Sequence, residues 1–228
     1  MIQIYSIQTV EEALQCVQAG AEAIGVAVAT GANLPAEVPE ATCAEIFAAL
    51  EGRAQRVLLV VTQTEEETVE YVRRLQPDIL QLCGNRLPAT PEFAAQCRAV
   101  RPGLRVLQAV GVDGPEAIDR AKYFAGFCDM LILDSIAPGI AGIGAAGRTH
   151  DWSIDAEIVR SVNIPVIVAG GLGPDNVEEC IRQIHPYGVD SLTKTSYKYS
   201  DGVMEKDIDK VRLFCQRADA AAAEYENK

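Results

Sequence analysis

A lone carboxylate at the end of an apolar segment is the first residue whose type and position suggest chemistry. Asp134 follows directly on the apolar residues 130–133. A carboxyl group at the end of a strand that opens on a pocket can act as a general acid or base. The alternative is a polar strand end that bonds to neighbouring loops. We favour the acid–base role, because residues that follow the strands carry the function in β/α barrels.

A glycine-rich turn is the second candidate, and it suggests anion binding. Residues 170–173 (GGLG) follow another apolar segment, and a helix is predicted from about Pro174. Glycine lets backbone N–H groups approach an anion, and a helix N-terminus favours negative charge. We therefore predict a phosphate site that includes Gly170 and Gly171, whereas the alternative is a tight strand–helix turn.

Three residues after the last apolar segment are predicted to complete this phosphate site. They are Thr193, Lys194 and Thr195. The ammonium group of Lys194 can pair with a phosphate or another anion. A solvated lysine is the alternative, and a Schiff-base role is a third option.

The segment 136–151 is long and rich in small residues, and it includes Gly144 and Gly147. This composition predicts a lid that closes on a substrate, in which Gly147 contacts the substrate. The alternative is a surface loop. His150 lies in the same segment. Its imidazole can exchange a proton near neutral pH, although a histidine on the surface of the lid is the alternative.

Three further candidates lie at the ends of the first and fourth apolar segments. Tyr5 and Cys83 are candidate catalytic residues, and Gln81 is a candidate binding residue. The ordinary pKa of tyrosine, about 10, makes Tyr5 a poor base, so it can instead fill the pocket. Cys83 is either part of the core or a weak nucleophile at the pocket wall.

Eight apolar segments alternate with amphipathic helical segments, which predicts a single (β/α)8 barrel over residues 1–218. Continuous apolar runs are typical of parallel strands buried on both faces. A doubly wound open sheet is the alternative, but the count is eight and no Gly-x-Gly-x-x-Gly motif follows the first segment. Residues 219–228 are predicted to fray. The predicted strands are residues 2–5, 23–28, 56–62, 79–82, 105–110, 130–134, 165–169 and 189–193.

Composition narrows the possible partners. The net charge of −12 argues against nucleic acid and anionic membranes, although a small anion can still bind at a helix N-terminus. The seven cysteines show no Cys-x-x-Cys spacing and only two histidines are present, so we expect a cytoplasmic protein without a metal site or cofactor. The expected partner is a small phosphorylated molecule, and the chain is expected to be a monomer or homodimer.

Four segments, each at a predicted strand end, resemble motifs of the phosphoribosylanthranilate isomerase family. Residues 131–135 (LILDS) are similar to the Leu-Leu-Asp motif of that family, which carries its catalytic acid. Residues 168–177 (VAGGLGPDNV) are similar to its Leu-Ala-Gly-Gly-Leu-x-Pro-x-Asn-Val. Residues 144–152 (GAAGRTHDW) and 78–84 (DILQLCG) resemble Gly-Gly-Thr-Gly-x-Thr-Phe-Asp-Trp and Asp-x-x-Gln-Leu-His-Gly. The resemblance implies a barrel isomerase whose acid is Asp134.

The chain departs from the family at several functional positions. Tyr5 stands where the family has its general base, a cysteine, and Cys83 stands where it has histidine. Residues 34–36 (LPA) replace Ser-Pro-Arg, so the arginine that holds the anthranilate carboxylate is absent. Residues 190–196 (DSLTKTS) replace Asp-Val-Ser-Ser-Gly-Val-Glu. The resemblance thus implies that the phosphate-binding turn and the acid are retained, whereas the other residues of the active site differ from those of the family.

Three functions are compatible with these residues. The leading interpretation is an acid–base isomerase of a different phosphorylated sugar or sugar-like substrate, with Asp134 as acid and His150, Tyr5 or Lys194 contributing. The second is genuine phosphoribosylanthranilate isomerase activity with a substituted base. The third is a non-catalytic sugar-phosphate-binding protein. The scaffold alone does not decide among them, because one barrel fold hosts many reactions.

Overall fold

Eight parallel strands close into a barrel, which confirms the predicted fold. The computed structural model describes residues 1–32, 34, 36–83, 87–136, 143–144, 149–198 and 204–226. β1 pairs with both β2 and β8, and this pairing closes the sheet. The strands are β1 (Ile2–Ile4), β2 (Ala23–Ala27), β3 (Gln55–Val60), β4 (Ile79–Leu82), β5 (Arg105–Gly111), β6 (Met130–Asp134), β7 (Val166–Val168) and β8 (Gly188–Ser191).

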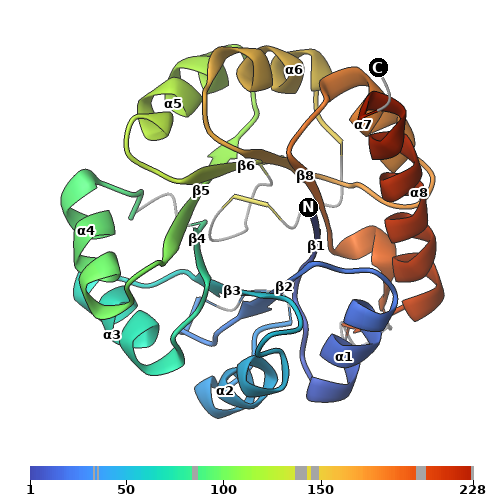
Figure 1. Ribbon diagram of the computed structural model, residues 1–228. Coiled ribbons are helices and arrows are strands. Elements are labelled where there is room, and N and C mark those ends of the chain that lie inside the picture. The colour runs from blue at the N-terminus through green and yellow to red at the C-terminus, as the bar shows by residue number, and fades with distance from the viewer. Residues whose placement is uncertain are drawn as a thin grey trace.

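Helices surround the strands on the outside of the barrel (Figure 1). Three of them begin at a threonine whose hydroxyl accepts a hydrogen bond from the backbone N–H three residues later: Thr9, Thr64 and Thr90. Such caps satisfy N–H groups that the helix itself leaves free. The helices are α1 (Val10–Gln18), α2 (Glu40–Ala49), α3 (Glu65–Leu75), α4 (Pro91–Val100), α5 (Glu116–Ala125), α6 (Trp152–Ser161), α7 (Val177–Ile184) and α8 (Ile208–Glu226).

The C-terminal region differs from the prediction in two ways. A 3-10 helix η1 (Thr193–Thr195) and a hairpin of β9 (Ser196–Lys198) and β10 (Met204–Lys206) lie between β8 and α8. Residues 219–226, which we expected to fray, continue α8, and Ala221 is fully buried. An alanine-rich segment has high helix propensity, and this packing retains its last turns.

The hydrophobic core has two layers. One lies between the strands and the surrounding helices and includes Phe47, Phe93 and Phe214. The other fills the inside of the barrel with residues such as Leu59, Leu107 and Ile132. The strands β2 to β7 all contribute apolar side chains to this interior cluster, so the barrel is a packed core rather than a pore. Within the described residues, no helix is long and apolar enough to cross a bilayer.

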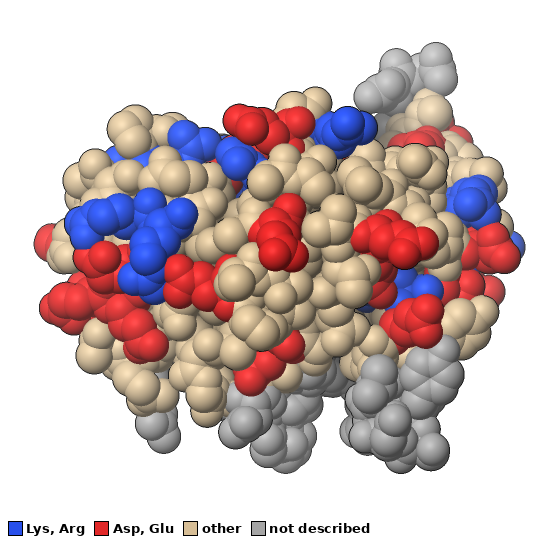
Figure 2. Space-filling model, turned by 90° about the horizontal axis from the view of Figure 1, so that it is seen from below, with Lys and Arg blue, Asp and Glu red and all other residues tan. Residues whose placement is uncertain are grey.

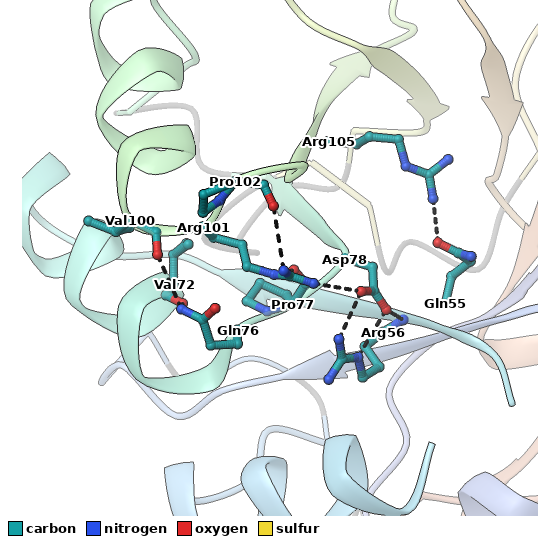
Figure 3. Close-up of polar contacts among 10 residues, drawn as sticks. All are labelled: Gln55, Arg56, Val72, Gln76, Pro77, Asp78, Val100, Arg101, Pro102 and Arg105. Carbon is teal, nitrogen blue, oxygen red and sulfur yellow. Dashed lines mark hydrogen bonds and ion pairs between the residues drawn. The ribbon is translucent and has the colours of Figure 1, made fainter. Parts of the chain in front are cut away.

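Ion pairs gather at the N-terminal end of the barrel (Figure 3). Asp78 accepts two hydrogen bonds from the guanidinium of Arg56, at 2.9 and 2.8 Å, and one from Arg101 at 3.1 Å. Arg105 lies beside Gln55 in the same view. On the side of the molecule shown in Figure 2, basic side chains lie among acidic ones. The N-terminal face of this fold generally serves stability, and we assign these pairs to it.

Candidate active site

A small cavity opens at the C-terminal ends of β6, β7 and β8. Asp134 and the twin glycines Gly170 and Gly171 line it, together with Tyr5 and Asp190. The predicted acid and the predicted phosphate turn therefore lie in one cavity. Its free volume is about 20 Å³, room for roughly one water molecule. The other lining residues are Leu172, Leu192 and Thr193.

Asp134 ends β6 and is held by the loop that follows it. Its Oδ1 accepts a 2.7 Å hydrogen bond from the backbone N–H of Ser135. Burial raises the pKa of Asp134 to about 6, although this hydrogen bond opposes the shift. A carboxyl group with a pKa near 6 can carry a proton close to neutral pH, as a general acid requires.

Both glycines of the turn need the freedom of glycine. Gly170 has φ +84° and Gly171 has φ +65°, in the left-handed region. A Cβ at Gly170 would also lie 2.9 Å from Ser135 Oγ and 3.0 Å from His150 Nδ1. The turn therefore packs closely against Ser135 and His150, and a side chain at Gly170 would not fit there.

A second cavity, of about 450 Å³, lies beside the first and shares Gly171 and Thr193 with it. Two lysines line it, Lys194 and Lys210. Lys210 pairs with Asp207 at 3.0 Å, whereas Lys194 forms no ion pair with any residue in the part of the chain that the structure describes. A Cβ at Gly173 would lie 2.5 Å from the Cβ of Lys194. Lys194 is therefore a cation next to the glycine turn that has no ion-pair partner among the described residues.

His150 lies inside the protein rather than on the surface of a lid, so the surface alternative is wrong. Its side chain is 6% exposed, and Nε2 lies 2.7 Å from Oδ2 of the fully buried Asp155. Nδ1 lies 3.1 Å from Ser135 Oγ. Both ring nitrogens are thus engaged with protein groups, and His150 is not among the residues that line the cavity.

Tyr5 and Cys83 are unsuited to proton abstraction near neutral pH. Burial raises the pKa of Tyr5 well above 10, with a further contribution from Cys83. Burial raises the pKa of the Cys83 thiol to about 12. The Tyr5 ring packs on β2, where a Cβ at Gly25 would lie 2.9 Å from it. Tyr5 therefore lines the cavity and packs against β2, and its role as a space-filling residue stays a prediction.

Two predicted binding residues use their polar groups inside the protein. Gln81 accepts a 2.9 Å hydrogen bond from Gln3 and donates one of 3.3 Å to Cys83 Sγ. The hydroxyl of Thr195 donates to Ser191 and Leu192 and is fully buried. Gly147 lies outside the described residues. The described part of the long loop does cross the barrel mouth, since Ile143 N–H donates to Cys83 O and Gly144 N–H to Ser135 O.

Asp190 is the site residue that sequence reasoning missed. It belongs to β8, is 6% exposed, and points into the cavity that Asp134 lines. Burial raises the pKa of Asp190 to about 8, and the charge of Asp134 adds to the shift. Period-two alternation along the eighth strand was the available signal, because it places Asp190 on the inner face of the barrel.

A larger cavity, of about 800 Å³, lies at the opposite end of the barrel. Arg53, Arg56 and Arg105 line it together with Glu22 and Asp78. Figure 3 shows Arg56 and Arg105 engaged with Asp78 and Gln55 there. We place the candidate site at the smaller cavity, because function resides at the C-terminal face in this fold.

Comparison with known proteins agrees with the fold and the motifs. The family model described as N-(5'phosphoribosyl)anthranilate (PRA) isomerase matches residues 3–217. A Haloferax volcanii protein named N-(5'-phosphoribosyl)anthranilate isomerase is 35% identical over 208 residues, 89% of this chain and 86% of the relative. One of the same name from Methanocella arvoryzae is 32% identical over 216 residues, covering 95% and 96%.

Solved structures give the same answer. The N-(5'-phosphoribosyl)anthranilate isomerase from Pyrococcus furiosus superposes with a TM-score of 0.74 at 27% identity, over 96% of this chain and 98% of that one. The phosphoribosyl anthranilate isomerase from Thermotoga maritima gives a TM-score of 0.78 at 25% identity, over the same shares. With a family model matched across nearly its whole length, this chain belongs to the N-(5'-phosphoribosyl)anthranilate isomerase family.

Proposed function

We propose that this protein isomerises N-(5'-phosphoribosyl)anthranilate. The support is a match to the family over nearly the whole chain, combined with a carboxyl group that shares a cavity with the twin-glycine turn. The substituted residues favoured a different phosphorylated sugar as substrate. Full-length relatives that carry this one name favour our second interpretation instead, genuine activity with a substituted base.

In the proposed reaction Asp134 is the acid. It protonates the ring oxygen of the aminated ribose, so that the ring opens and the nitrogen lone pair forms a C1=N bond. A base then removes the proton from C2. The raised pKa of Asp134 supports this role, since a fully ionised carboxylate has no proton to give.

We propose that the phosphate binds at the junction of the two cavities. Support comes from Gly171 and Thr193, which line both, and from Lys194, which forms no ion pair in the described part of the chain. Backbone N–H groups and an ammonium group together suit a doubly charged oxyanion. Because the cavity beside Asp134 has room for only about one water molecule, Tyr5 must shift when the sugar enters it.

The seven cysteines are all free and buried. We propose on this ground that the protein works in a reducing compartment such as the cytoplasm.

Turnover of freshly prepared N-(5'-phosphoribosyl)anthranilate tests the proposal. We expect the wild type to convert it and to rescue a tryptophan auxotroph that lacks this isomerase. Asp134→Asn should lower kcat at least about 100-fold, as loss of a general acid does. Asp129→Asn is the matched control, because Asp129 precedes β6 at the other end of the barrel, where it pairs with Arg98. Tight binding of sugar phosphates without turnover would favour the non-catalytic alternative.

A further inference from the structure

One carboxylate in the cavity has no part in the chemistry described so far. Asp190 is more than nine-tenths buried, and its Oδ1 has no hydrogen-bond partner among the described residues. A buried carboxylate oxygen without a partner is costly, so a protein keeps one where it meets a ligand or a proton. The cavity that contains this oxygen also contains Asp134 and the twin glycines.

Elimination among the cavity groups points to the same residue. Removal of the C2 proton needs a group that can lose its own proton within about one pH unit of neutrality. The pKa values of the partly buried Tyr5 and the buried Cys83 are far too high for this, because both groups lose solvation inside the barrel. His150 is bonded through both ring nitrogens and does not line the cavity. Asp190 is the carboxylate that remains once Asp134 has been assigned as the acid.

We propose that Asp190 is a catalytic residue that takes the C2 proton, in place of the thiolate base of the family. The inference rests on the proposed isomerisation. It assigns the base that the substitution of Tyr5 for cysteine leaves open, and it makes the reaction the work of two carboxyl groups across one cavity.

The protons and electrons balance without another reactant. Asp134 gives its proton to the ring oxygen, the C1–O bond breaks towards oxygen, and the nitrogen lone pair forms C1=N. Asp190 takes the proton from C2, the C–H electrons form C1=C2, and the C=N pair returns to nitrogen. Asp190 then gives its proton to C1 while the enol O–H proton passes to Asp134, which leaves a C2 ketone and restores both carboxyl groups.

The surroundings of Asp190 set the pH range of this pair. Its pKa is raised to about 8 by burial and then by the charge of Asp134, while a hydrogen bond from Gln3 and the charge of Lys206 oppose the shift. Asp134 has a pKa of about 6. Between these values the pair holds one proton, mainly on Asp190, and the productive form is the minor one in which that proton lies on Asp134. Below this range no base remains, and above it no acid remains.

The wild-type pH profile and one variant test the inference. We expect kcat/KM to peak near pH 7 and to fall on both sides, whereas a rate that still rises above pH 9 would point to a phenolic or thiol base and overturn the inference. Asp190→Asn should lower kcat at least about 100-fold. Asp190→Ala should regain turnover when formate, a small carboxylate, is added, but not when chloride is added.

Controls separate this inference from the proposed function. Asp129→Asn should keep wild-type kcat, and thermal unfolding should show that each variant is folded. If the wild type turns over and folded Asp190→Asn stays within about threefold of it, the base assignment is wrong and the isomerase proposal stands. If the wild type itself does not turn over the substrate, both are wrong. If neither Asp190 variant folds, the wild-type pH profile decides.

Discussion

The contact between His150 and Asp155 is expected to be a major source of stability at the barrel mouth. Asp155 is fully buried and the His150 side chain is 6% exposed, with 2.7 Å between Nε2 and Oδ2. Removing one partner of such a pair leaves the other buried and unpaired, which costs about 3–5 kcal/mol. For a chain of this length, that corresponds to a fall in Tm of roughly 10 °C.

A double-mutant cycle measures this interaction. His150→Phe and Asp155→Ala should each lower the free energy of unfolding in urea at pH 7 by about 3–5 kcal/mol. The double variant should lose at least about 1 kcal/mol less than the sum of the single losses, because the pair is already broken after the first change. Losses that add to within about 0.5 kcal/mol would refute the reasoning, since they would mean that the two side chains contribute independently.

Three other substitutions test separate parts of the account. Asp78→Asn should lower the free energy of unfolding by about 1–3 kcal/mol and leave kcat unchanged, because Asp78 lies on the N-terminal face and is partly exposed. Burial raises the pKa of Asp78, but the hydrogen bonds and charge of Arg56 outweigh burial, so the pKa is lowered overall. The stability that the ionised Asp78 contributes is therefore lost as the carboxylate is protonated. The difference in free energy of unfolding between Asp78→Asn and the wild type should shrink as pH falls below about 4. Tyr5→Phe should keep kcat within about threefold of wild type, and a loss of about 100-fold would show that the phenol takes part in proton transfer. Gly170→Ala should lower the melting temperature more than Gly103→Ala does. Both glycines have positive φ, so an alanine at either position costs about 1–2 kcal/mol of backbone strain. Of the two, only Gly170 has other atoms within 3.0 Å of the added Cβ. Equal losses would mean that the turn can widen freely.

Much of the fold could be predicted, because local patterns decide it. Continuous apolar segments define buried parallel strands, and their count defines the barrel. The secondary structure near the end of the chain was harder to predict, because a short hairpin such as β9–β10 has little apolar pattern of its own. The length of α8 depends on packing of residues such as Ala221 against the rest of the protein, which is a tertiary effect.

The candidate site could be predicted where residues follow strands directly. Asp134, Gly170 and Gly171 were identified in this way, and the structure brings them together. The role of His150 was harder, because its partner Asp155 lies within α6 and only the folded loop brings the two into contact. Asp190 was missed because an acid inside a strand looks structural until the cavity beside it is known.

Binding of ribose 5-phosphate, followed residue by residue through backbone amide NMR shifts, tests the central claim most directly. We predict that the largest shifts occur at Gly170, Gly171, Thr193 and Lys194, with a weaker effect at Asp134. Shifts centred instead on Arg53, Arg56 and Arg105, around the cavity at the opposite end of the barrel, would contradict it.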